Sequence, residues 1–320
     1  MTSGRERTAL YLCVLLFTVL AMCAGTAAAQ SPPSDAKAFQ THALQPLPAG
    51  SLRLKAEALG ALSEPGTVAP SSVIGADERW RITPTTGFPA RAIAYLALVD
   101  SDGYETGYCT GTFIGPDAVL TAGHCLYDST NGWAYAIAVV PGRDGATFPY
   151  GWQYASNASV PGSWYSSQDP NADWGLISMP SQTLGNTVGW LTLGVRTTLT
   201  LSGTNLAPII AGYPGDKPQG TQWAGSKPAL YGVQPYALQH LIDTYSGQSG
   251  AAVRRSSDNM VVGVHVRGSP SLNEATRVTQ QFLDTALGMC TTMGCTFSYY
   301  VEPILAPTGF LPLVGHNRAY

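Results

Sequence analysis

The stretch "CTGTFIGPDAVLTAGHC" spans residues 109–125 and reads as short β-strand sequence that ends in a tight turn. Two small residues before His124 allow the backbone to turn sharply, and Cys125 follows directly, so that a disulfide to Cys109 would fix the loop. Such a rigid mount suits a general base, whose nitrogen must lie within hydrogen-bond reach of the proton it takes. The stretch therefore indicates a β protein with a histidine held for chemistry. The alternative is a half-buried histidine satisfied by backbone groups.

A second stretch, "DTYSGQSGAAVRRS" at residues 243–256, places a serine between two glycines. Gly247 and Gly250 permit the backbone angles that aim two N–H groups at one point. We therefore expect Ser249 to be a nucleophile, with the amides of Gly247 and Ser249 as the oxyanion hole. Taken alone, the same letters also describe an ordinary serine and glycine loop.

A serine nucleophile with a histidine base also needs an orienting carboxylate. Asp173 lies in "NADWGLISM", just before a strand that reads as buried, where a carboxylate could be enclosed and bonded to an imidazole. Asp169 is the competitor, but it lies in the polar loop "SSQDPN" and is expected to be solvated. We expect Asp173 to orient His124.

The remaining pattern predicts an all-β protein. Short β-like runs recur between turn residues, as in an antiparallel sandwich or barrel, and no alternation of strands with helices is visible. The runs cover residues 92–99, 109–115, 135–140, 174–179, 207–213, 236–242 and 260–266. A helical period occurs convincingly only over residues 277–289.

The three candidate residues follow the order His124, Asp173, Ser249, which is the chymotrypsin order and not that of subtilisins or α/β-hydrolases. With "TAGHC" and its paired cysteine, the chain resembles the chymotrypsin-like serine proteases, and among them the secreted bacterial glutamyl endopeptidases. The resemblance implies two six-stranded antiparallel β-barrels with a C-terminal helix, the site in the cleft and the three catalytic roles. It is carried by "SVIGADERWRI" (72–82), residues 109–125, "PGRDGATFPYGW" (141–152), "NTVGWLTLG" (186–194), "GYPGDKPQGTQW" (212–223), "DTYSGQSG" (243–250) and "NEATRVT" (273–279).

The same resemblance implies a pocket for an acidic side chain, and hence cleavage of protein or peptide substrates after Glu and less well after Asp. Thr244 and His265 match the pocket residues of that branch, and the amine of a new N-terminus at Val73, or at Ser72, would join them. From spacing alone, His265 reads as a core histidine on an apolar strand. Arg267 departs from the branch; it could attract acids, but we expect it to be solvated.

The loop itself contains further departures from the best-known serine-protease pattern. A Lys- or Arg-selective pocket needs a carboxylate at its base, and Asp243 lies just outside the matching position. Gln248 stands where trypsin-like zymogens have the Asp that pairs with the freed amine, an Asp that the glutamyl endopeptidase branch also lacks. Ala251 and Ala252 replace the usual Gly-Pro, and nothing in the sequence explains them.

The ends of the chain read as processing segments. Residues 1–29 have the charged, apolar, small-residue order of a signal peptide, which predicts a secreted protein; a membrane anchor is the alternative. Residues 30–72 read as a pro-segment or a disordered linker. No acidic residue precedes Val73, so we expect another protease to activate the precursor. Residues 73–289 form the expected protease domain, and 290–320 a C-terminal extension whose structure the sequence does not predict.

Four cysteines remain beyond the signal, in two local pairs, which predicts the disulfides Cys109–Cys125 and Cys290–Cys295. The first would stabilise the fold by about 3 kcal/mol on the chain-entropy model. A zinc site is the alternative; we expect no metal and no cofactor, although a structural calcium is possible. The net charge of −3 opposes nucleic acid or anionic membrane as partners.

We expect a monomer that has no contact with a membrane once the signal peptide has been removed. Asn157 begins a glycosylation sequon that matters only in a glycosylating cell. Two other hypotheses stay open: the same fold with another substrate specificity, and an inactive protease-like binding protein. The intact His124, Asp173 and Ser249, with both glycines of the serine turn, oppose the second.

Overall fold

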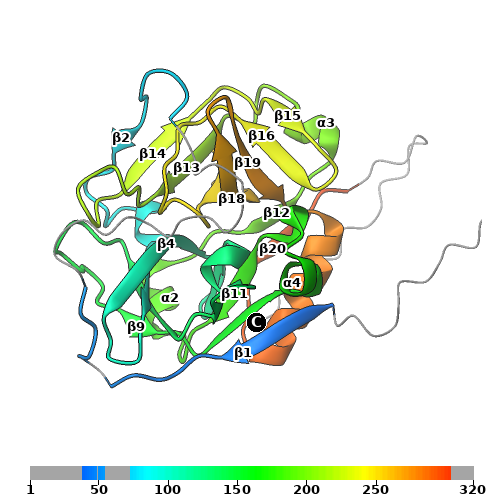
Figure 1. The fold of residues 1–320 in the computed structure, drawn as a ribbon. Coiled ribbons are helices and arrows are strands. Elements are labelled where there is room, and N and C mark those ends of the chain that lie inside the picture. The colour runs from blue at the N-terminus through cyan, green and yellow to red at the C-terminus, as the bar shows by residue number, and fades with distance from the viewer. Residues whose placement is uncertain (1–37, 49, 55–72, 304–320) are drawn as a thin grey trace, which may run out of the picture. The chain divides into compact units, whose positions relative to one another are not determined.

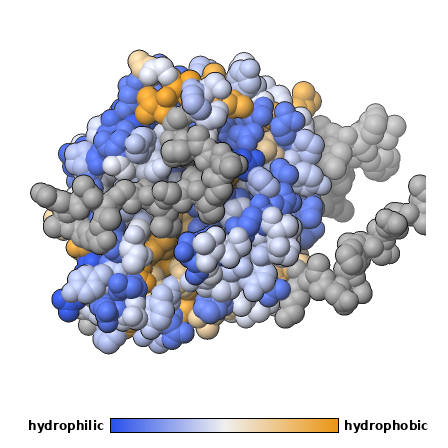
Figure 2. Space-filling view, viewed as in Figure 1, coloured by the Kyte–Doolittle hydropathy of each residue, from blue (hydrophilic) through white to orange (hydrophobic). Residues whose placement is uncertain are grey.

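Two β-sheets make up most of the protein in the computed structural model, which describes residues 38–48, 50–54 and 73–303 (Figure 1). These residues all fall within one unit, Ala36–Tyr320. The expected signal peptide lies outside the described residues. The bond before Val73 lies at their border. Within them, no helix is long and apolar enough to cross a membrane. The face shown in Figure 2 is largely hydrophilic, with apolar residues gathered in patches.

The first sheet has eight strands in the order β1-β10-β11-β5-β4-β3-β8-β9. Its central strand β3 is buried on both faces: Ile93, Tyr95, Ala97 and Val99 belong to one apolar cluster, and the residues between them to another. This alternation is the period of two that a strand imposes on its side chains. The strands are β1 (Phe39–Ala43), β3 (Ile93–Val99), β4 (Glu105–Phe113), β5 (Ala118–Thr121), β8 (Ala136–Pro141), β9 (Gln153–Tyr154), β10 (Asn157–Pro161) and β11 (Gly175–Ser178).

The second sheet has ten strands, eight of them in the order β15-β16-β19-β18-β17-β13-β14-β2. Strand β12 pairs in parallel with β18 and β20. The strands are β2 (Trp80–Arg81), β12 (Leu193–Val195), β13 (Pro208–Gly212), β14 (Trp223–Ser226), β15 (Gly232–Val233), β16 (Ala237–His240), β17 (Ala252–Arg255), β18 (Val261–Ser269), β19 (Leu272–Arg277) and β20 (Tyr299–Val301). A small hairpin joins β6 (Tyr127–Asp128) to β7 (Gly132–Trp133).

Helices are few and short. They are α1 (Gly162–Ser167), α2 (Thr183–Val188), α3 (Thr198–Leu201) and α4 (Gln280–Met293), with the 3-10 turns η1 (Ala90–Ala92), η2 (Gly123–Cys125) and η3 (Pro170–Ala172). Helix α4 begins after Thr279, whose hydroxyl accepts a hydrogen bond from the Phe282 amide, and ends at Gly294, whose φ is 70°. These are the N-cap and left-handed C-cap signals of a helix.

The all-β expectation is confirmed, and each of the seven expected β-like runs overlaps an observed strand. The strand counts differ from the expected six and six, because the described sheets hold eight and ten strands and are not closed barrels. Two strands lie outside the expected protease domain of residues 73–289. Strand β1 lies inside the segment expected to be a pro-segment or linker, and β20 pairs with β12, so residues 290–303 are part of the protease fold.

Candidate active site

His124 is held in η2 by one carboxylate that makes two bonds to it. Its ring Nδ1 lies 2.9 Å from Asp173 Oδ2, and its backbone N–H donates to Asp173 Oδ1 at 2.9 Å. Because a carboxylate only accepts, Nδ1 carries the proton and Nε2 is the basic nitrogen. Gly123 makes this approach possible, since a Cβ there would lie 3.1 Å from Asp173 Oδ1 and 3.0 Å from Trp164 Cδ1.

The two candidate carboxylates are separated by the turn η3. Asp169 begins the turn and accepts a hydrogen bond from the Asn171 amide at 3.0 Å. Asp173 ends it and is buried, and its carbonyl accepts from Thr276 Oγ1 at 3.1 Å. The structure therefore brings Asp173 to His124 and gives Asp169 a capping role.

Ser249 lies in a turn that contacts both sheets. The Ser249 carbonyl accepts from the Thr110 amide of β4 at 2.9 Å, and the Gly250 amide donates to the His265 carbonyl of β18 at 2.8 Å. Gly247 and Gly250 have φ angles of 95° and 87°, which favour glycine. A Cβ at Gly250 would lie 2.2 Å from the Thr110 carbonyl oxygen, so this position also needs glycine for space.

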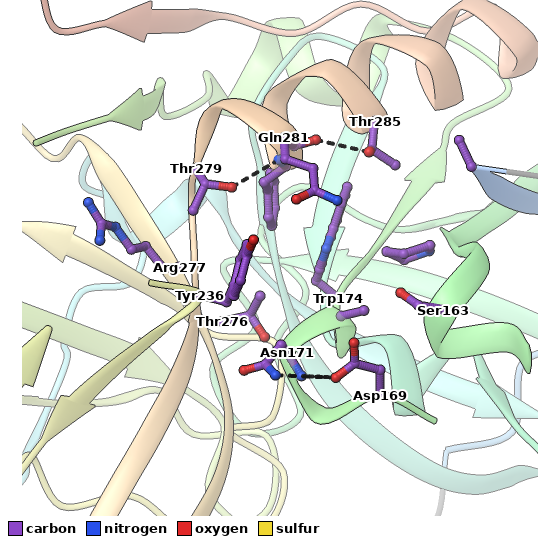
Figure 3. Close-up of a pocket in the computed structure, with 14 residues that line it drawn as sticks. Ser163, Asp169, Asn171, Trp174, Tyr236, Thr276, Arg277, Thr279, Gln281 and Thr285 are labelled. Atoms are coloured by element: carbon purple, nitrogen blue, oxygen red, sulfur yellow. Dashed lines mark hydrogen bonds between the residues drawn. The ribbon is translucent and has the colours of Figure 1, made fainter. Parts of the chain in front are cut away.

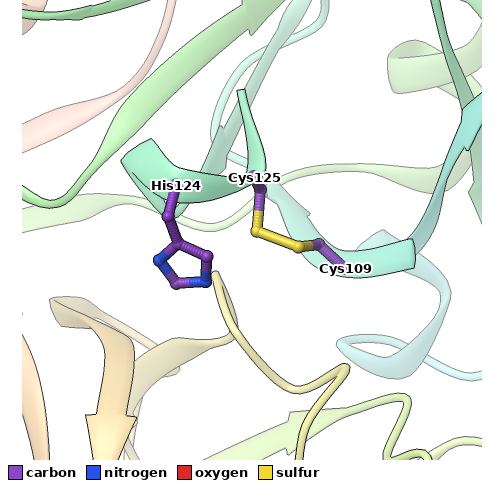
Figure 4. A group of neighbouring side chains, drawn as sticks. All are labelled: Cys109, His124 and Cys125. Carbon is purple, nitrogen blue, oxygen red and sulfur yellow. A yellow bond between two sulfur atoms is a disulfide. The ribbon is translucent and has the colours of Figure 1, made fainter. Parts of the chain in front are cut away.

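The Cys109–Cys125 disulfide joins β4 to the residue that follows His124 (Figure 4). The side-chain donor atoms of Cys109, His124 and Cys125 all lie within 4.8 Å of one another. The two sulfurs are bonded to each other, so neither is the thiolate that a zinc site of this kind uses. The second expected disulfide, Cys290–Cys295, closes the end of α4.

The predicted pocket residues Thr244 and His265 are both fully buried. Among the described residues, nothing forms a hydrogen bond with the buried Thr244 hydroxyl. His265 Nδ1 lies 3.3 Å from Nε2 of a second buried histidine, His240. Burial lowers the pKa of His240 to about 3. Burial, and then the charges of His240 and His124, lower the pKa of His265 well below its usual range.

Sequence reasoning missed His240. The only available signal was its place in "YALQHLI", where Leu238 and His240 of β16 and Ile242 just beyond it alternate with the partly exposed Gln239 and Leu241 and so face inward. Alternation marks His240 as buried, but it does not show which residue it meets.

Asp243 binds the segment that follows Val73. Its two carboxylate oxygens accept hydrogen bonds from the amides of Ile74 and Glu78, each at 2.8 Å, and it is 2% exposed. These bonds hold residues 74–78 against the chain next to Thr244. Asp243 therefore anchors the N-terminal part of the domain.

Gln248 is fully buried and binds the same segment. Its Oε1 accepts from the Tyr245 amide at 3.0 Å and from Arg79 Nη1 at 3.3 Å. Arg79 in turn forms ion pairs with Asp77 and Asp216. The amide of Gln248 thus joins the nucleophile turn to Arg79.

Arg267 is not solvated as expected. Its Nε donates to Glu274 at 2.8 Å and its Nη1 to the Pro170 carbonyl at 2.7 Å. The register between β18 and β19 shifts between His265 and Arg267, and such a bulge re-aims a side chain. Arg267 therefore crosses to the turn that carries Asp173.

A hollow of about 350 Å³ lies behind that turn, between η3 and α4 (Figure 3). Its lining includes Asp169, Trp174, Tyr236 and Gln281. None of the predicted pocket residues lines it, so it is a separate feature from the substrate pocket.

The fold and the family comparison together define a trypsin-like serine peptidase: the trypsin-like peptidase domain family matches residues 109–264. A Bacillus subtilis (strain 168) protein named extracellular metalloprotease is 42% identical over 218 residues, which cover 67% of this chain and 68% of that protein. The glutamyl endopeptidase of Bacillus licheniformis is 41% identical over 224 residues, which cover 67% of each chain.

A solved structure of a Glu endopeptidase superposes with a TM-score of 0.62 and 29% identity, over 68% of this chain and 99% of that one. The chain therefore belongs to the glutamyl endopeptidase branch of the chymotrypsin-like serine proteases. It is a serine endopeptidase.

Proposed function

We propose that the protein is an extracellular endopeptidase that cleaves after Glu, and less well after Asp, and that it is made as a precursor. The observation that carries the specificity is the Asp243–Thr244 pair. Asp243 is occupied by two backbone amides, while the Thr244 hydroxyl next to it is buried with no hydrogen-bond partner among the described residues. A buried hydroxyl lacks a favourable bond until an acceptor reaches it, and a substrate carboxylate is such an acceptor.

The proposed chemistry uses the His124–Asp173 pair and Ser249. Ser249 Oγ attacks the substrate carbonyl carbon while His124 Nε2 takes the hydroxyl proton, and Asp173 stabilises the imidazolium that forms. The imidazolium then gives this proton to the leaving amine, and the acyl group stays on Ser249. A water then attacks the acyl carbon while His124 takes its proton. The proton passes to Ser249 Oγ as the acid is released. No metal or cofactor takes part in these steps.

Gly247 and Ser249 amides are the proposed oxyanion donors. Among the described residues, no acceptor takes the Gly247 N–H, and the carbonyl of the same peptide unit, that of Ser246, accepts a hydrogen bond from the Gly215 amide at 2.7 Å. An amide fixed in direction and left for the oxyanion costs no reorganisation when negative charge develops.

Three donors are proposed for the acidic side chain: the Thr244 hydroxyl, a ring N–H of His265 and the amine of Val73 after processing. The proposed tautomer of His265 depends on its contact with His240, in which either ring nitrogen can be the donor. When His240 Nε2–H donates to His265 Nδ1, the proton of His265 lies on Nε2, from which it can donate to a carboxylate.

Peptides that differ only in the residue before the scissile bond test the specificity. Glu, Gln, Asp, Lys and Leu form the series, and Ser249→Ala is the inactive control. We expect Glu to be cleaved best and Gln poorly, because the two have the same shape and differ in charge. Preferred cleavage after Lys or Leu would replace this proposal with another specificity, and no cleavage of any peptide would favour the binding protein.

Thr244→Val removes the hydroxyl at nearly constant volume. We expect it to raise KM for the Glu peptide and to lower the ratio of kcat/KM for the Glu peptide to kcat/KM for the Gln peptide. Thr244→Ser keeps a hydroxyl and should keep this ratio.

The same peptide assay distinguishes a serine mechanism from the metal-dependent mechanism that the name of the Bacillus subtilis relative implies. A serine-reactive organophosphate should abolish cleavage, and loss of activity to a chelator alone would contradict the serine mechanism.

Activation is proposed to need a second protease, because residues 70–72 before Val73 are Pro-Ser-Ser and contain no acid. Recovery of the Val73 terminus from secreted Ser249→Ala would support this. Accumulation of uncut precursor only in that variant would show that the enzyme processes itself.

A further inference from the structure

Residues 38–48 and 50–54, called here the N-terminal strap, precede the proposed mature terminus and pack on the first sheet. Strand β1 pairs with β10 over all five of its residues, from Phe39 opposite Pro161 to Ala43 opposite Asn157. Side chains add to the ladder, since Ser159 Oγ donates to the Gln40 carbonyl at 2.9 Å. Figure 1 shows this segment in blue along the edge of the domain, with α4 beside β1.

The strap also contributes apolar side chains to the core. Leu44 is 4% exposed and belongs to the main apolar cluster. Phe39 packs on Gly288 of α4, where a Cβ would lie 2.8 Å from the Phe39 ring. Leu47, Leu52 and Leu54 pack against the second cluster, beside β3. Release of the strap would transfer these groups to water, which is unfavourable.

The far end of the strap is bonded separately. The Arg53 amide donates to the Gly103 carbonyl at 2.9 Å, and the Glu105 amide donates back to the Arg53 carbonyl at 3.1 Å. Ser51 Oγ lies 3.0 Å from the Tyr154 hydroxyl. The two ends of the strap therefore bind different parts of the sheet, and release of one end leaves the contacts of the other end intact.

Removal of the strap would have two structural consequences. Strand β10 would become an exposed edge with unpaired backbone groups, which promotes association of strands. The His42 ring, stacked on Trp133 at 5.2 Å, would leave an aromatic cluster that includes Tyr127. Tyr127 accepts from Trp164 Nε1 at 2.9 Å, and the Trp164 ring lies 6.5 Å from the ring of His124. The strap thus supports the side of the domain that carries the catalytic histidine.

We infer that the strap stays bound without a covalent link after the chain is cut between Leu54 and Val73, so that the processed enzyme consists of two chains. This inference rests on the proposed processing, and it holds for any cut in that interval. The contacts named above all join the strap to residues beyond Val73, so hydrolysis removes the tether and none of these contacts. The contacts all lie on one fragment, so while one of them is formed the other groups stay at high effective concentration near their partners, and the fragment remains bound.

The test uses the secreted full-length precursor with Ser249→Ala and a recognition sequence for a sequence-specific protease placed between residues 60 and 66. After cleavage, native size-exclusion chromatography should give one peak that contains both chains by intact mass. In concentrated guanidinium chloride the two chains should separate. Elution of the strap fragment alone in native buffer would overturn the inference.

Matched variants identify what holds the strap. Leu44→Asp places a charge in the core and should release a larger share of the fragment after cleavage than Ala43→Asp, which places the same charge on the neighbouring exposed side chain. Equal release from both would overturn the role given to Leu44. The experiment requires neither catalytic activity nor the natural cleavage site, so loss of the strap would leave the proposed peptidase function standing.

Discussion

The two buried histidines predict that the protein loses stability on mild acidification. In the folded protein, burial lowers the pKa of His240 to about 3. In the unfolded chain, a histidine has a pKa of about 6.5. Between these values the unfolded state binds more protons, so the free energy of unfolding rises with pH and falls as pH is lowered through this window. The pKa of His265 is lowered as well, so its effect has the same sign.

The size of the effect follows from the His240 pKa. Acidification from pH 6.5 to pH 5 protonates the unfolded imidazole almost fully and leaves the folded one neutral, which reduces the free energy of unfolding by about 2 kcal/mol for His240 alone. This range lies above the window in which Asp and Glu titrate in unfolded chains.

His240→Gln tests this account, because an amide retains a donor toward His265 and does not titrate. Urea unfolding would be measured at both pH values in the Ser249→Ala background, which prevents self-digestion. The loss of stability on acidification should be about 2 kcal/mol smaller in the variant than in its parent. His42→Gln removes the imidazole stacked on Trp133 and controls for the replacement itself. Equal pH dependence in His240→Gln and parent would refute the reasoning.

Three further variants have expected outcomes. Asp173→Asn places an amide donor at His124 Nδ1 and so moves the ring proton to Nε2; kcat should fall by about four orders of magnitude, and a fall below tenfold would contradict the assigned role. Replacing both Cys109 and Cys125 by Ala opens a crosslink between residues 16 apart, and the free energy of unfolding should fall by about 3 kcal/mol, measured by urea unfolding under oxidising conditions. Gly250→Ala puts a Cβ 2.2 Å from a carbonyl oxygen at a φ of 87°; active-site titration should show a smaller active fraction, and a full titre would show that the turn can relax.

The features that the sequence predicted are those carried by short, contiguous stretches. The residues around His124 and Ser249 contain their own turn glycines, and Asp173 adjoins a buried strand. His240 could not be found in this way. It meets His265 because β16 and β18 both pair with β19, and that pairing joins residues 25 apart through a third strand. Strand β1 was missed because its five residues carry no turn signals, and its partner β10 lies more than 100 residues away.

Gln248 and Asp243 together bear on how processing would act. In the uncut chain, Asp243 already holds the amides of Ile74 and Glu78, and Gln248 already accepts from Arg79. The nucleophile turn therefore needs no new amine to form these bonds. A cut before Val73 would add a positive charge beside the pocket and leave the turn as it is. We therefore expect processing to lower KM for Glu peptides much more than it raises kcat. A kcat that rises by orders of magnitude while KM stays constant would show instead that the turn itself is rebuilt.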